Sequence, residues 1–493
     1  MRNLHRRSRR AVAPHSPTRG GAWRGRPGPP KAKDALEGGR RVAITLADQG
    51  LSSVSNFAVA VAVARGAGAS GLGGFTLAFA GWTVLGAVHR SLVTDPMAID
   101  GDVRDPRAVA SVRRGFGAEV LLGIAGALCL VVVGGVLLSV GQHTFGVSVL
   151  SMALWMPVLV VQDYWRWVGF MSRRPGKALA NDALFNVVQA GGFTYLLVHH
   201  VHSVSLLIGA WGLGALTGGL FGMWQYRALP NPRGGMALLK ERWSFSKWMA
   251  GSNVTGWFAN QALVVVAGAI LGPAGLGAFR ACQNLAGGPA GVLIQAGGSV
   301  GLPETSKSYA EGGLDSALRT AWLVTAAGFA SVFAGAALVF LWGRTLLTLV
   351  YGPSFAHLQS AAEILSVGYL FLAFYLGPVL MLKVTKDTRK LMYVEVFSVV
   401  LGLATLGLFA TAFGVKGAAL AELVTSIVTA AAFVRAQQSI RRRRLGLRGT
   451  AAGAPAGGPQ AALGTGGAPG PGTSVTCQVI HVEAAEPEKE PAL

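Results

Sequence analysis

The stretch FGAEVLLGIAGALCLVVVGGVLLSV, from Phe116 to Val140, determines the fold class of this chain. It is apolar almost throughout, and Glu119 is the one charged residue in it. A bilayer core about 30 Å thick needs roughly 20 apolar residues in a helix, because backbone groups cannot be left unpaired in lipid. The stretch is therefore predicted to be a membrane-spanning helix.

Apolar blocks of similar length occur on both sides of it, and the whole chain is 52% hydrophobic and only 13% charged. That composition is typical of a membrane protein. We predict an all-α membrane protein with about twelve transmembrane helices. The predicted spans are Val42–Arg65, Leu72–Ser91, Phe116–Val140, Val147–Asp163, Ala178–Val198, Ser203–Tyr226, Trp248–Leu271, Leu276–Leu302, Ala321–Trp342, Ala361–Leu382, Leu391–Phe413 and Val415–Val434.

The distribution of Lys and Arg predicts the orientation. The formal net charge of +21 could suggest a nucleic-acid partner, but the basic residues lie in the tails and in alternate loops. Cytoplasmic loops of membrane proteins carry an excess of Lys and Arg, so topology explains the charge without nucleic acid. Both termini are predicted to be cytoplasmic, and the protein is expected in the inner (cytoplasmic) membrane. The basic loops lie at 104–114, 173–177, 227–247, 307–319 and 383–390.

The ends of the chain differ from its centre. Residues 1–41 are rich in Arg, Pro and Gly, and residues 441–493 are rich in Gly, Ala and Pro, so both are predicted to be disordered cytoplasmic tails. Between them we expect a six-helix half at 42–226, a cytoplasmic linker at 227–247 and a second six-helix half at 248–440. Cys129, Cys282 and Cys477 are too scattered for a disulfide framework or a metal site, and no cofactor is expected.

An internal repeat supports the two halves. GLGGF at 71–75 aligns with GLGAF at 275–279, an offset of 204 residues. The same offset places Asn56 on Asn260 and Gly68 on Gly272. Because it relates predicted spans that run in the same direction, it indicates two parallel halves. Halves related by an axis along the membrane normal are typical of transporters, with the substrate site between them.

Polar side chains recur at helical spacing in the first span, and a similar stripe occurs in the seventh. Such stripes face a bundle interior or a wet cavity, although hydrogen bonding between helices explains them equally well. A shared central cavity is the interpretation that matching stripes favour. The stripes consist of Thr45, Asp48, Gln49, Ser52 and Asn56 in the first span, and of Asn253, Trp257, Asn260 and Gln261 in the seventh.

Charges inside spans cost about 2.5 to 3.5 kcal/mol each at a helix centre, so each needs a reason. Arg280 lies well inside the eighth predicted span, and a guanidinium there suits phosphate or pyrophosphate, whose oxygens match its forked donors. Arg90, near the end of the second span, could act similarly, or its side chain could reach the lipid phosphates. The candidate substrate-binding residues are Arg280, Arg90, Asn56, Asn260, Gln49 and Gln283.

Several carboxylates also lie within predicted spans. Any of them could exchange a proton in a proton-coupled carrier, but a structural ion pair is an alternative for each one. Asp163 and Arg166 lie at the predicted cytoplasmic exit of the fourth span, where aromatic anchoring by the neighbouring WRW sequence is a sufficient explanation. The candidate ion-coupling residues are Asp48, Glu119, Glu363 and Glu422; Asp182 and Glu395 are in comparable positions.

Three stretches carry a family resemblance: ADQGLSSVSNF (47–57), GASGLGGFTLAFA (68–80) and LGPAGLGAFRACQNLAGG (271–288). So do the stretches from Val158 to Gln189 and from Tyr351 to Leu365. Over residues 42–435 the chain resembles polysaccharide-transport flippases of the multidrug/oligosaccharidyl-lipid/polysaccharide (MOP) superfamily.

The resemblance implies two helix bundles that open alternately to each side of the membrane and move lipid-linked sugar across it. In that family, basic cavity residues in spans one, two and eight engage the lipid pyrophosphate or an anionic sugar. Arg90 and Arg280 lie in matching spans, whereas span one offers only Arg65 at its end and Asp48 within. The implied partners are the bilayer, a lipid-linked glycan and polysaccharide-assembly enzymes.

The sequence leaves four other functions as alternatives. A multidrug or small-cation exporter of the same superfamily would use acids such as Asp48 and Glu363. A major-facilitator carrier would need a G-x-x-x-D-R-x-G-R-like motif, which the loop at 95–115 does not contain. A membrane glycosyltransferase or ligase would need a large catalytic loop, so an enzyme is not expected. The last alternative is a membrane scaffold that recruits partners through its tails.

Overall fold

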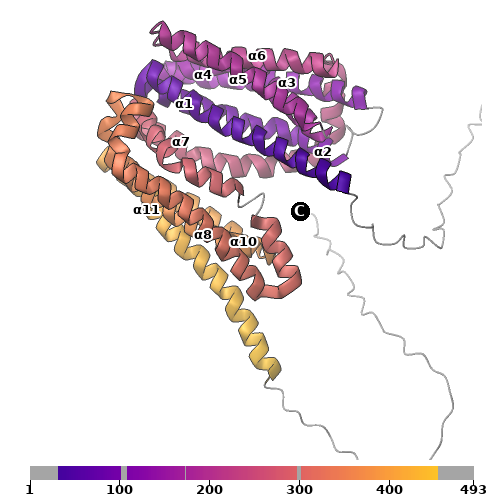
Figure 1. Ribbon diagram of the computed structural model, residues 1–493. Coiled ribbons are helices and arrows are strands. Elements are labelled where there is room, and N and C mark those ends of the chain that lie inside the picture. The colour runs from indigo at the N-terminus through magenta and orange to yellow at the C-terminus, as the bar shows by residue number, and fades with distance from the viewer. Residues whose placement is uncertain (1–31, 101–107, 173, 297–300, 453–493) are drawn as a thin grey trace, which may run out of the picture. The chain divides into compact units, whose positions relative to one another are not determined.

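The computed structural model describes residues 32–100, 108–172, 174–296 and 301–452 (Figure 1). All regular secondary structure in these ranges is helical, as predicted. The predictions for residues 1–31, for residues 104–107 of the basic loop at 104–114 and for the tail from 453, including Cys477, lie outside the described residues.

The α-helices are α1 (Ala32–His89), α2 (Asp95–Asp100), α3 (Ala108–Ser139), α4 (His143–Met171), α5 (Pro175–Val198), α6 (Val204–Tyr226), α7 (Pro232–Ala296), α8 (Leu302–Tyr351), α9 (Gln359–Phe374), α10 (Leu376–Val384) and α11 (Thr388–Ala452). A π-helical turn, η1 (Arg90–Thr94), follows α1, and a 3-10 helix, η3 (Pro353–Leu358), follows α8. Contacts divide the chain after Ser439, and apart from the C-terminal end of α11 every feature described below lies in the part up to that residue.

Eight helical stretches in the described residues are long and apolar enough to cross a membrane, which supports an all-α, multi-pass membrane protein. The number of crossings and the side on which each terminus lies stay predictions. The eight stretches are Gly50–Ala98, Val109–Ser139, His143–Met171, Val204–Tyr226, Gln261–Gly288, Leu302–Tyr351, Pro353–Val384 and Arg389–Ser439.

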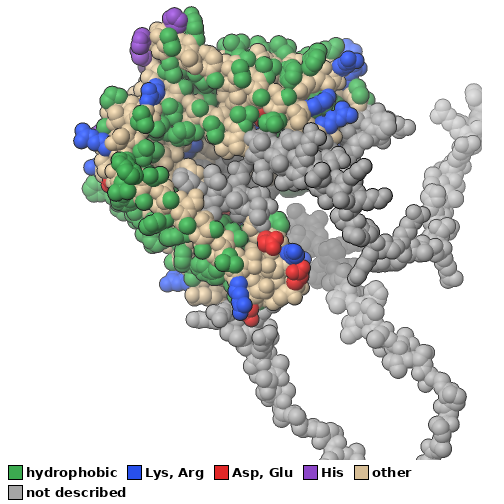
Figure 2. All heavy atoms as spheres, in the orientation of Figure 1, with side chains coloured by type: hydrophobic (Ala, Val, Ile, Leu, Met, Phe, Trp, Pro, Cys, Tyr) green, Lys and Arg blue, Asp and Glu red, His purple; other side chains and the backbone are tan. Residues whose placement is uncertain are grey.

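The outer surface agrees with a lipid environment. Large apolar side chains point outward along the helices; Leu128 on α3, for example, is 62% exposed and Leu323 on α8 is 71% exposed. Figure 2 shows hydrophobic side chains over much of the coloured surface in view. A soluble monomer rarely exposes apolar surface this continuously, whereas a membrane-spanning bundle must.

The longest helices turn back on themselves at glycines. α1 departs from helical geometry at Gly68, where φ is 66° and ψ is −167°. Residues on both sides of this glycine, such as Asn56 and Phe75, line one cavity, so the two parts of α1 lie side by side. Only glycine adopts this backbone region readily, because a Cβ atom would clash. The predicted first and second spans are therefore the two parts of α1.

α7 has the same turn at the aligned position. Gly272 has φ 68° and ψ −178°, close to the values of Gly68. α1 and α7 also pack closely against each other just beyond these turns. A Cβ atom on Gly73 would lie 1.8 Å from the carbonyl oxygen of Pro273, and one on Gly277 would lie 1.8 Å from that of Ala69.

The two contacts are reciprocal under the 204-residue offset, since Gly73 aligns with Gly277 and Ala69 with Pro273. We call these four residues the glycine crossing. A contact that maps onto itself with its partners exchanged is what a local two-fold axis produces.

Small residues also allow close packing between α4 and α6. Cβ atoms on Gly212 and Gly222 of α6 would lie 2.0 and 2.2 Å from the rings of Trp155 and Trp165 of α4. Small residues at helix interfaces are usual in membranes, because close van der Waals packing replaces the hydrophobic effect there.

Three helix ends differ from the predicted boundaries. α1 begins at Ala32 and α11 continues to Ala452, so parts of both predicted disordered tails are helical. α7 begins at Pro232, so most of the predicted linker at 227–247 is helical as well. The linker packs on the first bundle, because the Asn231 amide donates to the carbonyl oxygen of Arg113 over 3.1 Å. Composition alone did not reveal that contact.

Candidate functional site

A cavity of about 320 Å³ lies between α1 and α7. The first part of α1 contributes Asn56, and the second part contributes Thr76. α7 contributes Arg280, Gln283 and Asn284 from one face of its second part. These residues follow at helical spacing, so the cavity wall on this side is a polar stripe.

Among the described residues that line this cavity, Arg280 is the one basic residue, and it is half-buried. In the part of the chain that the structure describes, its guanidinium pairs with no carboxylate. Arg280 Nη1 donates a hydrogen bond to the amide oxygen of Gln283, at a long 3.4 Å. A guanidinium has five donors, so most of those on Arg280 remain available to a ligand.

Gln283 connects Arg280 to a carboxylate behind the cavity. Its Nε2 donates to Oε2 of Glu422 on α11 over 3.0 Å, and the Tyr369 hydroxyl of α9 interacts with the same carboxylate. Glu422 and Gln283 also line a smaller space of about 160 Å³, together with Thr76 and Thr425. The two spaces share Thr76 and Gln283. These two residues therefore lie between Glu422 and the main cavity.

Another part of the cavity lining is aromatic. Phe75 and Phe79 of α1 lie 5.9 and 5.8 Å from the ring of Trp211 on α6, measured between centroids. All three residues line the cavity. The cavity thus has a polar, cationic wall on α7 and an aromatic wall on α1 and α6. Ligand sites commonly combine a large apolar surface with a few polar groups in this way.

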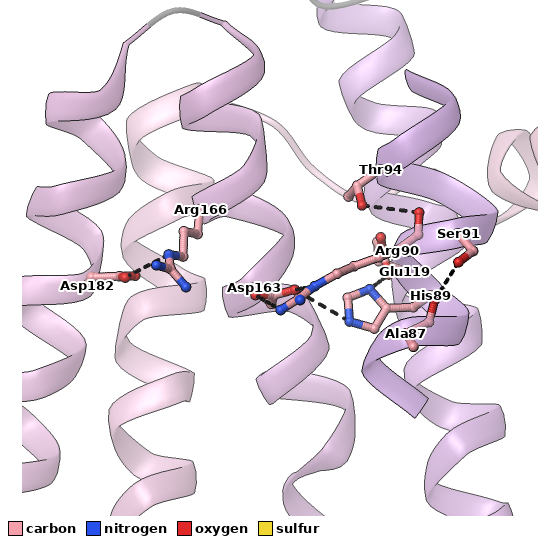
Figure 3. Close-up of polar contacts among 9 residues, drawn as sticks. All are labelled: Ala87, His89, Arg90, Ser91, Thr94, Glu119, Asp163, Arg166 and Asp182. Atoms are coloured by element: carbon pink, nitrogen blue, oxygen red, sulfur yellow. Dashed lines mark hydrogen bonds and ion pairs between the residues drawn. The ribbon is translucent and has the colours of Figure 1, made fainter. Parts of the chain in front are cut away.

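A second group of charged residues lies among α3, α4 and the junction of α1 with η1 (Figure 3). Arg90 in η1 donates from Nε and Nη2 to the two carboxylate oxygens of Asp163 on α4, over 2.8 and 2.9 Å. His89 Nδ1 lies 3.1 Å from Glu119 of α3, and His89 Nε2 lies 3.6 Å from Asp163. We call His89, Arg90, Glu119 and Asp163 the charged network.

The charged network corrects one interpretation from the sequence. Asp163 was assigned to aromatic anchoring at the membrane interface, but it is buried and held by a bidentate arginine, so that assignment is wrong. Arg166, assigned in the same way, lies 3.0 Å from the buried Asp182 of α5. Two carboxylates thus each face an arginine inside the bundle, which compensates much of their desolvation cost.

The structure brings together three of the predicted substrate-binding residues, Asn56, Arg280 and Gln283, in the main cavity. Arg90 does not line that cavity and is bound to Asp163. The side chains of Gln49 and Asn260 lie outside the described residues. The substrate roles of all six residues stay predictions.

Of the predicted ion-coupling residues, Glu119 belongs to the charged network and Glu422 lies next to the cavity. Glu363 accepts a hydrogen bond from Gln359 one turn earlier on α9, over 2.7 Å. The side chain of Asp48 lies outside the described residues. Their coupling roles also stay predictions.

Sequence reasoning missed Tyr369 and the aromatic wall. The i, i+4 spacing of Phe75 and Phe79 on the span that carries His89 was the available signal.

Comparisons with known proteins agree with the fold. A family model described as "Polysaccharide biosynthesis protein" matches residues 176–358. The structure resembles the inward-facing conformation of a multidrug resistance MATE family transporter of the MOP superfamily, with a TM-score of 0.63, 15% identity, and coverage of 79% of this chain and 94% of that one. No curated protein sequence matches the chain.

Two further solved structures share the architecture. The lipid II flippase MurJ, in an inward closed conformation, has a TM-score of 0.59 and 13% identity, over 80% of this chain and 87% of that one. A MOP superfamily transporter from Pyrococcus furiosus has a TM-score of 0.52 and 14% identity, over 81% and 94% of the two chains. At such identities the likeness shows the fold, and together with the family match it confirms the resemblance found in the sequence.

Proposed function

We propose that this chain, which has the fold of MOP superfamily transporters and a segment typical of polysaccharide biosynthesis proteins, is a flippase for a polyprenyl-linked oligosaccharide or polysaccharide precursor. The observation that carries the proposal is Arg280, a guanidinium that faces the cavity between α1 and α7 without a carboxylate partner among the described residues. A cation held in this way needs an anion, and the phosphate groups of a lipid carrier supply one.

The rest of the cavity suits the sugar next to the phosphate. The amides of Asn56, Gln283 and Asn284 can bond hydroxyl groups, while the aromatic wall at Phe75 and Trp211 can pack against the C–H face of a sugar ring. A volume of about 320 Å³ holds a phosphate group and one or two sugars. A longer glycan therefore requires the cavity to open, and the polyprenyl chain stays in the lipid.

Movement by alternating access is part of the proposal. In this proposal the two halves, 42–226 and 248–440, rock about the local axis at the glycine crossing. The reciprocal contacts of that crossing support the existence of two equivalent halves. Arg65 adds a second link at this end of α1, since its guanidinium donates to the carbonyl oxygens of Leu349 and Val350 at the end of α8. The proposal also includes twelve membrane spans with both termini in the cytoplasm. The protein would lie in the inner membrane, where polysaccharide-assembly enzymes supply its substrate.

The first experiment compares wild type with Arg280→Ala in liposomes that contain a fluorescent polyprenyl-pyrophosphate sugar. We expect translocation to fall at least tenfold in the variant, because a desolvated bidentate contact to phosphate contributes about 1.5 to 3 kcal/mol. Arg280→Lys should recover only part of the rate, since an ammonium cannot bind two oxygens in the fork geometry. The measurement is the rate at which the sugar becomes accessible on the opposite face.

Arg344→Ala is the matched control, because Arg344 is an exposed arginine on α8 that does not line the cavity. Its rate should equal that of wild type. A rate in Arg280→Ala equal to that of Arg344→Ala would contradict the proposal.

A multidrug or small-cation exporter is the second candidate, favoured by Glu422 beside the cavity. In that case wild type moves no lipid-linked sugar but exports organic cations, and Glu422→Gln, rather than Arg280→Ala, abolishes transport.

A further inference from the structure

The side chain of Gln283 bridges two charges of opposite sign. Its Oε1 accepts from Arg280, and its Nε2 donates to Glu422. An amide has one acceptor end and one donor end, so this orientation is the one that suits an ionised Glu422. Thr76 and Gln283 both line the main cavity and the smaller space behind it, and of these two Gln283 is the one that bonds to both Arg280 and Glu422.

The surroundings of Glu422 provide little compensation for a full negative charge. From α7 it faces Gln283 and, farther away, Arg280; from α9 it faces the hydroxyl of Tyr369. Tyr375, between α9 and α10, lies near Glu422 as well, and it also lies near Glu395 on the first part of α11. No basic side chain forms an ion pair with Glu422 among the described residues. A carboxylate at this depth therefore has two accessible forms, ionised or protonated.

We propose that Glu422 is a proton-binding site whose occupancy sets the anion affinity of Arg280, and that Gln283 is the positioning residue that connects the two. The inference rests on the proposed function, since it assigns an anion to Arg280. The inference adds to the proposed function a way in which a proton gradient changes anion binding at Arg280.

The coupling follows from charge and from the orientation of the amide. With Glu422 ionised, its negative charge opposes an anion in the cavity, and the Gln283 amide is oriented with its oxygen on a donor of Arg280. Protonation removes that charge, and the carboxylic acid can then donate to Gln283 and reverse the amide. Arg280 then loses the amide oxygen of Gln283 as an acceptor, and its N–H groups become available to the ligand. Linkage requires the reverse effect of equal size, so a bound anion strengthens proton binding at Glu422.

The test measures binding of a glucosyl farnesyl phosphodiester to the full chain in detergent, at pH values of about 5.5 and 8. The phosphodiester keeps one negative charge at both pH values, so the probe itself does not titrate. We expect wild type to bind about tenfold more tightly at the lower pH, a typical size for coupling between two sites. Glu422→Gln, which is neutral at all pH values, should bind with the tight affinity at both.

The variant Gln283→Leu tests the role of Gln283 as the link between Arg280 and Glu422, separately from proton binding at Glu422. It keeps Arg280 and Glu422, so binding should persist, but its pH dependence should shrink to threefold or less. Glu395→Gln is the matched control on the same helix and should keep the full pH dependence. Glu119→Gln, in the charged network, should keep it too.

The outcomes separate the two proposals. Failure of wild type to bind the probe at either pH overturns the proposed function. Binding that depends on Arg280 but not on pH, or a pH dependence that survives in Glu422→Gln or disappears in Glu119→Gln, overturns the inference alone.

Discussion

Replacing Gly277 by alanine is expected to abolish transport, although the change adds a single methyl group. The Cβ atom would lie 1.8 Å from the carbonyl oxygen of Ala69, far inside the contact distance of carbon and oxygen. The obstacle is backbone on a packed helix, so no side-chain rotation relieves it. α1 and α7 must then separate at the glycine crossing, and a carrier that cannot close one end cannot alternate. We expect at least a hundredfold loss in the liposome assay.

The conformation can be measured directly with spin labels at His200, in the loop after α5, and Ser354, in η3. The native cysteines are first replaced. In Gly277→Ala the distance between the labels should increase relative to wild type. Gly407→Ala is the matched control, because nothing lies within 4 Å of a Cβ atom at Gly407 and alanine is the better helix former. It should change neither the distance nor the transport rate.

Gly73→Ala tests the two-fold relation. Its Cβ atom would meet the carbonyl oxygen of Pro273 at the same 1.8 Å, so the loss of transport should match that of Gly277→Ala. Wild-type transport in both variants, with unchanged label distances, would show that the crossing has no part in the transport cycle.

The sequence predicted those parts of the fold and of the candidate site for which a local rule was sufficient. The apolar blocks identified the spans because every backbone group in lipid must be paired within a helix. The 204-residue offset aligned Gly68 with Gly272 because a repeat preserves equivalent positions, and the structure gives both glycines a positive φ. Arg280 and Asn56 were selected because polar groups at helical spacing must face something other than lipid.

The remaining features depend on how helices rotate and pack, which spacing does not determine. Asp163 and Arg90 lie far apart in sequence, and their pairing follows from the depth and rotation of α4 against η1. The aromatic wall was missed because Phe75 and Trp211 are also ordinary core residues, and only the position of the cavity distinguishes them. The close approach at Gly73 was missed because glycine is abundant in all the spans.

A substitution in the charged network is expected to have the second large effect, a loss of folding stability. Asp163→Asn removes the charge that faces Arg90 while keeping the shape of the side chain. Because Asp163 is only 4% exposed, the variant leaves the guanidinium and the nearby His89 with a weaker partner inside the bundle. Breaking a buried pair on one side costs about 3 to 5 kcal/mol. The Arg90 side chain is 34% exposed, so we expect about 2 to 3 kcal/mol and a clearly lower unfolding temperature in detergent.

Glu241→Gln is the control for an exposed pair. Arg114 donates to Glu241 over 2.6 Å and thereby lowers the pKa of that carboxyl, but the side chain of Glu241 is 64% exposed and water replaces the contact. The unfolding temperature should therefore hardly change. A double variant, Arg90→Met with Asp163→Leu, should recover part of the loss of Asp163→Asn, because no unpaired charge then remains in the bundle. If Asp163→Asn is as stable as Glu241→Gln but has lost transport, the charged network acts in the transport cycle rather than in holding the first bundle together.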